Sequence, residues 1–179
     1  MRKVILYIAV SLDGYIADAW GGVDWLGGQS ADYTGDYGYE AFTAQVDTVI
    51  MGGRTYRQIT QELSPQQWVY QGMQSYVITR CPQTDTDEIH FVQQSPTQLV
   101  QQLRAQSGKD IWICGGADIA QQLIANDLID VYDLSVMPCL LGSGIPLFGA
   151  LEQELPLELL SAAAENGVVR CRYQRRCAV

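Results

Sequence analysis

Short apolar runs alternate along the chain with segments of helical periodicity, a pattern that indicates an α/β protein. In the first half, β-rich apolar runs at Val4–Val10, Thr48–Met51 and Ser75–Thr79 predict buried strands. Between the first two, residues 11–30 are rich in Gly, Asp and Trp and predict a long loop, which in a compact domain is often functional. A helix is expected over about 31–45.

The second half continues this alternation. Residues 61–74 are rich in Gln and Ser and predict irregular structure, and Ile89–Val92 predicts a short strand. Ser95-Pro96 has the signature of an N-cap followed by the first position of a helix. The strand Ile111–Cys114 then leads into another helix. Its expected buried positions are Ile119, Ala120, Leu123 and Ile124.

The C-terminal part predicts a hairpin. After a strand at Asp130–Met137, the pair Asn166-Gly167 separates Leu157–Ala164 from Val168–Arg175, and this dipeptide favours a two-residue hairpin turn. The expected fold is a mixed, mainly parallel sheet flanked by helices and closed by an antiparallel hairpin. A chain of 179 residues is expected to form one domain, 1–179. An arginine run is expected on the exposed face of an edge strand: Arg170, Arg172, Arg175 and Arg176.

Two junctions carry the most informative chemistry. At Cys114-Gly115-Gly116 and again at Met51-Gly52-Gly53, a buried strand runs through two glycines into a helix. Such a turn directs unpaired backbone N–H groups of a helix start at a ligand, a favourable site for an anion. Two such turns in one small domain suggest a dinucleotide. Neither turn fits the G-x-G-x-x-G fingerprint, and glycines also serve close packing, so both interpretations stay open.

Neighbouring side chains favour the phosphate interpretation at the first junction. Arg54 follows the glycines with a guanidinium that forks onto phosphate, and Thr55 adds a hydroxyl donor. Arg80 stands just past a strand end, where it is either the cation for a 2′-phosphate or an ordinary surface arginine.

Composition narrows the classes of partner. A net charge of −9 argues against nonspecific nucleic-acid binding, and the chain has no apolar stretch of the length that spans a membrane. The single histidine, His90, makes a histidine-based metal site untenable, and no metal is expected. Five scattered cysteines without a C-x-x-C pair favour reduced thiols in the cytoplasm.

Four segments in the same order resemble the dihydrofolate reductase superfamily. They are Ala9–Ala17, Val49–Tyr56, Ile113–Ala117 and Leu140–Phe148. The last, with its Gly-x-Gly-x-Pro-Leu-Phe, is more similar to the reductase domain of riboflavin biosynthesis, the C-terminal half of the bifunctional deaminase–reductase. Because no zinc-deaminase signature is present, the chain resembles a stand-alone form. The resemblance implies the dihydrofolate reductase-like three-layer fold.

The resemblance also implies NADPH as the cofactor, with a role for each matching position. Gly52, Gly53, Arg54 and Thr55 would bind phosphates on one side, and Thr79 and Arg80 would approach the adenosine 2′-phosphate. Ala9 and Ile16 would flank the nicotinamide, and the 11–26 loop would close over it. The diphosphate would lie at the second helix start, formed by Gly115, Gly116, Ala117, Asp118 and Ile119.

The substrate side has weaker candidates. By analogy with the carboxylate that holds the pterin in dihydrofolate reductases, Asp36 is the candidate catalytic and substrate-binding acid, with Glu40 as its catalytic neighbour. The alternative is a solvated acidic helix face. Trp25 on the loop either stacks on a heterocycle or packs beneath the loop. The pair Asp13-Gly14 is interpreted as a turn rather than a catalytic acid.

Together these features predict an NADPH-dependent oxidoreductase acting on a small amino-pyrimidine or pterin-like heterocycle. The resemblance points to 5-amino-6-(5-phosphoribosylamino)uracil reductase of riboflavin biosynthesis, with dihydrofolate reductase as the alternative. An alternative of another class is a non-catalytic nucleotide-binding or regulatory protein on the same fold. Analogy with riboflavin-type reductases favours a homodimer.

Overall fold

A sheet of eight strands organises the described part of the chain. The computed structural model describes residues 1–81 and 83–176. Across the sheet the strand order is β5-β4-β3-β6-β1-β7-β10-β9, and the first six strands run parallel. The strands are β1 Val4–Ser11, β3 Val46–Gly52, β4 Gln74–Ile78, β5 Ile89–Val92, β6 Asp110–Gly115, β7 Val131–Met137, β9 Leu157–Glu165 and β10 Val168–Arg175. Two short strands, β2 Tyr15–Ala17 and β8 Ile145–Pro146, form a separate antiparallel pair.

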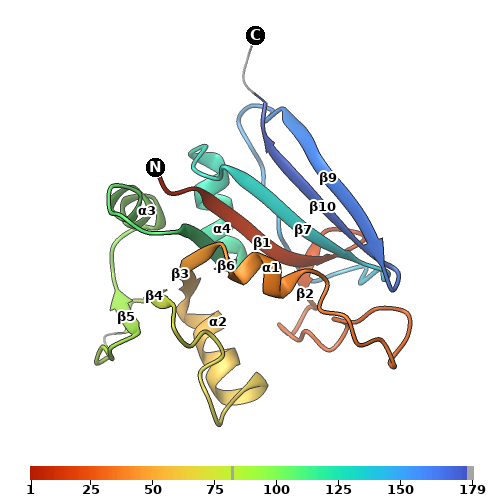
Figure 1. Cartoon of the computed structure of the whole chain (residues 1–179), viewed down its shortest axis with the longest axis horizontal. Helices are drawn as coiled ribbons and strands as arrows, with labels where there is room; N and C mark the ends of the chain where they lie inside the picture. Colours follow the sequence, from red (N-terminus) through yellow and green to blue (C-terminus); the bar gives the residue numbers. More distant parts are fainter. Residues whose placement is uncertain (82, 177–179) are drawn as a thin grey trace.

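Helices cover both faces of this sheet, so the predicted three-layer α/β architecture is confirmed (Figure 1). On one face lie α3 (Pro96–Arg104) and α4 (Ala117–Ala125), and on the other lie α1 (Tyr39–Thr43) and α2 (Gly53–Gln58). A π-helical turn, Ile59–Leu63, extends α2, and the rest of 61–73 is irregular as expected.

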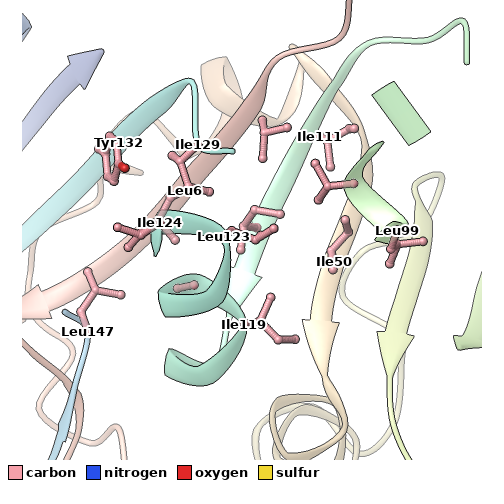
Figure 2. Packing of buried hydrophobic residues seen from close by; sticks show 14 of the residues in the cluster. Leu6, Ile50, Leu99, Ile111, Ile119, Leu123, Ile124, Ile129, Tyr132 and Leu147 are labelled. Atoms are coloured by element: carbon pink, nitrogen blue, oxygen red, sulfur yellow. The ribbon is translucent and has the colours of Figure 1, made fainter. Parts of the chain in front are cut away.

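The first core layer forms where the sequence periodicity predicts it. The four expected apolar residues of α4 are all buried. Figure 2 shows Ile119, Leu123 and Ile124 of this helix beside Leu6 of β1 and Ile50 of β3. Ser95 caps α3 as predicted, because its hydroxyl accepts from the Gln98 N–H while the Gln98 side chain returns to the Ser95 N–H.

The helix expected over 31–45 is largely absent, and only Tyr39–Thr43 is α-helical. The cause is two consecutive residues in the left-handed region, Tyr37 with φ 53° and Gly38 with φ 75°. A right-handed helix cannot continue through such a pair. The segment before α1 is therefore a turn, and the carbonyls of Tyr37 and Gly38 accept hydrogen bonds from Arg170.

The C-terminal hairpin corrects a second expectation. Asn166 and Gly167 form the predicted turn, both with positive φ, but β10 pairs with β7 as well as with β9 and is an internal strand. Its arginines Arg170 and Arg172 are therefore half-buried instead of lining an exposed edge. The edge strand is β9, at the opposite end of the sheet from β5 (Figure 1).

Among the described residues, no helix combines the length and the apolar character needed to cross a membrane.

Candidate functional site

The two glycine junctions lie side by side at the carboxyl ends of adjacent parallel strands. β3 pairs with β6, and Met51 lies opposite Gly115. A Cβ atom placed on Gly52 would lie 3.9 Å from the Gly116 nitrogen, and one placed on Gly116 would lie 3.5 Å from the Thr55 hydroxyl. The missing side chains thus leave backbone exposed between the turns. This edge is where open α/β sheets bind ligands.

Both glycine turns leave the following helix without a side-chain cap. Gly52 precedes α2 and Gly116 precedes α4, each in an extended conformation, and neither makes a side-chain cap hydrogen bond within the described residues. The Gly115–Gly116 peptide bond is cis. The first N–H groups of both helices are therefore available donors, and their dipoles favour an anion. Ala117 is half-buried here, and Ile119 packs into the core behind the turn.

Two cations flank the first turn. Arg54 and Arg80 are exposed, and neither forms an ion pair within residues 1–81 and 83–176. A Cβ on Gly53 would lie 3.1 Å from the Thr79 hydroxyl, so Thr79 borders the same turn. The carboxylate of Asp118 in the first turn of α4 accepts from Gln122 at 3.0 Å. Its side chain is an acceptor, so only its backbone N–H can serve as a phosphate donor.

The loop after β1 is fixed at two points. Asp13 accepts from the Leu141 and Gly142 N–H groups at 3.1 and 2.7 Å, which ties the loop to the Leu140–Phe148 segment. The Ser11 hydroxyl, with these N–H groups, lowers the pKa of Asp13 below its usual value, so this residue is an ionised turn anchor. Farther along, the Gln58 amide of α2 donates to the Gly21 carbonyl at 2.8 Å.

The nicotinamide candidates lie where this loop begins. Ala9 is half-buried in β1 and pairs with Ser135 of β7, while Ile16 of β2 packs against the core. Trp25 is half-buried and donates to the Gly22 carbonyl at 3.3 Å, whereas Trp20 is 93% exposed. The indole N–H of Trp25 is thus already used within the loop, and contact between this side chain and a substrate stays a prediction.

The candidate acid Asp36 is exposed and serves the start of α1. Its two carboxylate oxygens accept from the N–H groups of Glu40 and Gly38, each at 2.8 Å. These bonds lower its pKa, so the group is ionised at neutral pH and is an acceptor rather than a proton donor. Glu40 is exposed, and nothing in the structure gives its side chain a further partner within the described residues.

An aromatic cluster lies beside the second glycine turn, and no sequence motif predicts it. The Tyr7 ring stacks on Phe42 of α1 at 3.9 Å, and Tyr39 meets the Trp112 ring at 6.1 Å. Cys114, directly before Gly115, contacts the Tyr70 hydroxyl at 3.1 Å. Burial raises the pKa of the Cys114 thiol to about 11, so the thiol stays protonated. This wall therefore consists of aromatic rings and a neutral thiol.

A buried ion pair supports this wall from the C-terminal hairpin. Asp133 of β7 is fully buried, and Arg170 of β10 binds both of its oxygens at 2.7 Å. The pair leaves no sequence motif, because the two residues are 37 positions apart. A signal was present nonetheless: a charged residue inside the apolar strand Val131–Met137 requires a partner.

His90 lies on β5 and contacts Gln74 at 2.7 Å, as a strand residue would. Among the described residues, no cluster of three or more His, Cys, Asp or Glu side chains is suited to hold a metal ion.

Comparison with known proteins places this geometry in one family. The model of the RibD C-terminal domain matches residues 2–169. The chain is 39% identical over 175 residues to the "Uncharacterized protein YwjB" of Bacillus subtilis (strain 168), covering 97% of this chain and 98% of that protein. It also superposes on a "Putative riboflavin biosynthesis protein" from Shewanella sp. PV-4, with 31% identity, a TM-score of 0.85, and coverage of 98% and 99% of the two chains.

A third match relates the fold to a named reductase. It is the diaminohydroxyphosphoribosylaminopyrimidine deaminase/5-amino-6-(5-phosphoribosylamino)uracil reductase of Thermotoga maritima, at 14% identity and a TM-score of 0.70. The match covers 98% of this chain but 57% of that one, and at this identity it shows a shared fold. The family model and the relatives that span the whole chain lead to one conclusion: the protein belongs to the RibD C-terminal domain family, as a reductase-like domain.

Proposed function

We propose that the protein is an NADPH-dependent reductase of a small amino-pyrimidine related to 5-amino-6-(5-phosphoribosylamino)uracil. The observation that carries the proposal is the juxtaposition of two uncapped helix starts, at Gly52 and Gly116, whose absent side chains leave room for phosphate against the backbone. The exposed cations Arg54 and Arg80, which form no ion pair within the described residues, would supply charge for further phosphates.

The protein's own part in the reaction is binding, orientation and exclusion of water. NADPH supplies a hydride when bound. The turn at Gly115-Gly116 would hold its diphosphate, and the loop fixed by Asp13 and Gln58 would cover the nicotinamide near Ala9. The aromatic wall around Tyr39 would limit water at the reacting carbon, which protects the hydride from side reactions.

The substrate side favours a pyrimidine over a folate. In dihydrofolate reductases a carboxylate on the first helix holds the pterin. Here Asp36 stands before α1, and both of its oxygens already accept backbone N–H groups. This use of Asp36 makes dihydrofolate reductase the weaker alternative. Because Asp36 is not free to act as an acid, its hydrogen bonds also favour, to a lesser degree, the alternative of another class, a non-catalytic nucleotide-binding protein.

The proposal is tested by titrating the protein with NADPH and following the fluorescence of its four Trp residues. Saturable binding at micromolar cofactor, with weaker binding of NADH, is expected. Turnover is then measured with 5-amino-6-(5-phosphoribosylamino)uracil and, separately, with dihydrofolate. No binding at millimolar NADPH would exclude the reductase. Binding without oxidation of NADPH by either compound would favour the non-catalytic alternative.

The role of Asp36 has its own test. If the carboxylate only organises α1, Asp36→Ala lowers the thermal stability of the protein and reduces the turnover number by less than about tenfold. A loss of turnover of about 100-fold or more with unchanged stability would restore the catalytic assignment. Asp32→Ala is the matched control, because this exposed neighbour makes no side-chain hydrogen bond within the described residues.

We also propose that the protein is a homodimer in which two β9 strands pair. All nine residues of this edge strand are exposed, and Leu159–Ala164 contains no charge or proline to discourage pairing. Antiparallel pairing about Ser161 would place Leu157 opposite Glu165, and it would bring no two like charges together. A cytoplasmic location fits the four free cysteines of the described residues.

Sedimentation analysis tests this assembly. Two copies are expected for the native protein at micromolar concentration. Leu159→Lys is expected to give monomers, since it places a charge within the uncharged pairing stretch, opposite Ala163 of the other copy. Val69→Lys is the control, because Val69 is also an exposed apolar residue but lies far from β9 in the sequence. A native protein that sediments as a monomer would exclude the assembly.

A further inference from the structure

Arg170 is held rigidly by the core of the sheet. Its Nε and Nη2 atoms bind the two oxygens of Asp133 at 2.7 Å each, and Asp133 is fully buried. The Arg172 Nε lies 3.0 Å from the same carboxylate. A bidentate pair of this kind fixes the plane of the guanidinium, because both groups are planar and both bonds must stay aligned.

The third guanidinium nitrogen reaches a segment that is more than 130 positions away in the sequence. Nη1 of Arg170 donates to the carbonyls of Gly38 and Tyr37, at 3.1 and 3.3 Å. The approach is so close that a Cβ on Gly38 would lie 2.1 Å from Nη1. The guanidinium also lies over the Tyr7 ring, 5.2 Å from its centroid. Arg170 therefore joins the buried sheet to the turn that precedes α1.

That turn carries the groups at the open end of the site. It sets where Asp36 meets the N–H groups of α1 and where Tyr39 stands above β1 and β6, at ring distances of 6.3 Å from Tyr7 and 6.1 Å from Trp112. Figure 1 shows α1 in front of these two strands. A displacement of the turn would move the aromatic wall relative to the glycine turn at Gly115-Gly116.

The hairpin holds the same turn at a second point. The Asn166 side chain donates to the Tyr37 hydroxyl at 2.8 Å and to the Ser30 carbonyl at 3.1 Å. These contacts fix the side chain of Tyr37, whereas Arg170 fixes its backbone. The segment between the loop and α1 is thus positioned by the C-terminal hairpin rather than by its own helical propensity.

We propose that Arg170 is a positioning residue for the substrate: oriented by buried Asp133, it holds the Tyr37-Gly38 turn and so places Tyr39 and Asp36 at the substrate end of the site. The clause about the substrate rests on the proposed function. The placement of the turn itself rests only on the contacts above. Cofactor binding should be independent of Arg170, because Arg170 has no contact with either glycine turn in the described residues.

The principal variant is Arg170→Lys, which keeps a positive charge beside Asp133 but cannot fork onto it and reach two carbonyls at once. Hydrogen–deuterium exchange of peptides covering 36–42 is expected to become about tenfold faster, because two charge-assisted hydrogen bonds are lost. NADPH affinity is expected to stay within about twofold of the native value. Arg175→Lys is the matched control, since Arg175 lies on the same strand and pairs with Asp127 at 2.8 Å.

A second variant disturbs the same contact from the other side. Gly38→Ala keeps both Arg170 and Asp133 but places a methyl group 2.1 Å from Nη1, at a φ of 75° that disfavours alanine. It should reproduce the faster exchange at 36–42. It should also speed alkylation of Cys114, because Tyr39 packs on Trp112, the residue two positions before this cysteine. Cys114 alkylation is followed by mass spectrometry of its peptide, so the other cysteines do not interfere.

Kinetics separate positioning from a merely structural role. With 5-amino-6-(5-phosphoribosylamino)uracil as the probe, Arg170→Lys should raise the KM for the pyrimidine about tenfold while the KM for NADPH stays unchanged. Unchanged exchange at 36–42 in both variants would overturn the proposal, as would exchange that rises equally throughout the protein. If the native protein does not reduce the probe, the proposed substrate fails, and the exchange measurement still decides the role of Arg170.

Discussion

The two ends of the site are built in different ways. The proposed cofactor end consists of backbone: two glycine turns, at Gly52 and Gly116, brought together by adjacent parallel strands. The proposed substrate end consists of side chains from distant parts of the chain, as when Arg170 contacts the Tyr37 carbonyl. A backbone site leaves a local sequence motif, because glycine is needed where it stands. A side-chain site assembled over such separations leaves almost none.

The largest expected effect tests the cofactor end. Gly52→Ala or Gly116→Ala should lower NADPH affinity about 100-fold, because the added methyl occupies the space where phosphate would meet two or more N–H groups. Folding should be spared. Both glycines have a φ of −85°, which alanine adopts, and the unfolding free energy should change by less than about 1 kcal/mol. Fluorescence titration and thermal unfolding give the two values.

Gly27→Ala is the control for these variants, since a Cβ there meets nothing within 4 Å. If NADPH affinity of the Gly52 and Gly116 variants stays within a factor of three of the native value, the backbone does not form a phosphate site. The claim that the proposed cofactor end is built from backbone would then be wrong.

A smaller effect is expected from the two cations. Arg54→Ala or Arg80→Ala should weaken NADPH by about tenfold and leave NADH almost unchanged, the effect of losing one charge-assisted contact to the 2′-phosphate. Arg57→Ala is the matched control, because Arg57 is an exposed arginine one turn farther along α2. If a variant loses equal affinity for NADPH and for NADH, the arginine that it replaces would be assigned to the diphosphate instead of the 2′-phosphate.

The smallest effect concerns Cys114, where the two ends meet. Its pKa is raised from 9.0 to about 11, so the protonated thiol is favoured in the folded state. The resulting stability is complete below the unfolded pKa and is lost as the pH rises through the folded one. Between about pH 8.5 and 10 the loss from this group should be about 1 kcal/mol. Cys114→Val should remove that part of the slope in urea unfolding, and an unchanged slope would show that the thiol is accessible to water.

Most of the fold was predictable because its signals are local. Ser95-Pro96 capped its helix as expected, Asn166-Gly167 formed its turn, and the apolar stripe of α4 is buried. The helix expected over 31–45 was wrong because Gly38 lies in the left-handed region, where Arg170 contacts its backbone. The helical propensity of residues 31–45 cannot predict a contact with a residue so far away in the sequence.

The candidate site shows the same difference between local signals and long-range contacts. For Gly52, Gly116 and Arg54 the sequence motif and the structure agree on the place, and their role in binding stays a prediction. Asp36 was chosen by analogy with a helix position. The structure instead shows both of its oxygens bound by backbone N–H groups, and no pattern in the sequence indicates that.

The sequence by itself determined the mainly parallel α/β sheet and the two glycine turns, because hydrophobic periodicity and glycine act on neighbouring residues. The family followed from the resemblance of four segments of the sequence. Only the tertiary structure decided that the two glycine turns lie side by side, with 3.9 Å between a Cβ built on Gly52 and the Gly116 nitrogen. It also decided that β10 is internal and that Arg170 supports the turn before α1. These depend on strand order and on the burial of Asp133. A buried charge selects its partner from the whole chain, since leaving it unpaired is unfavourable by several kcal/mol.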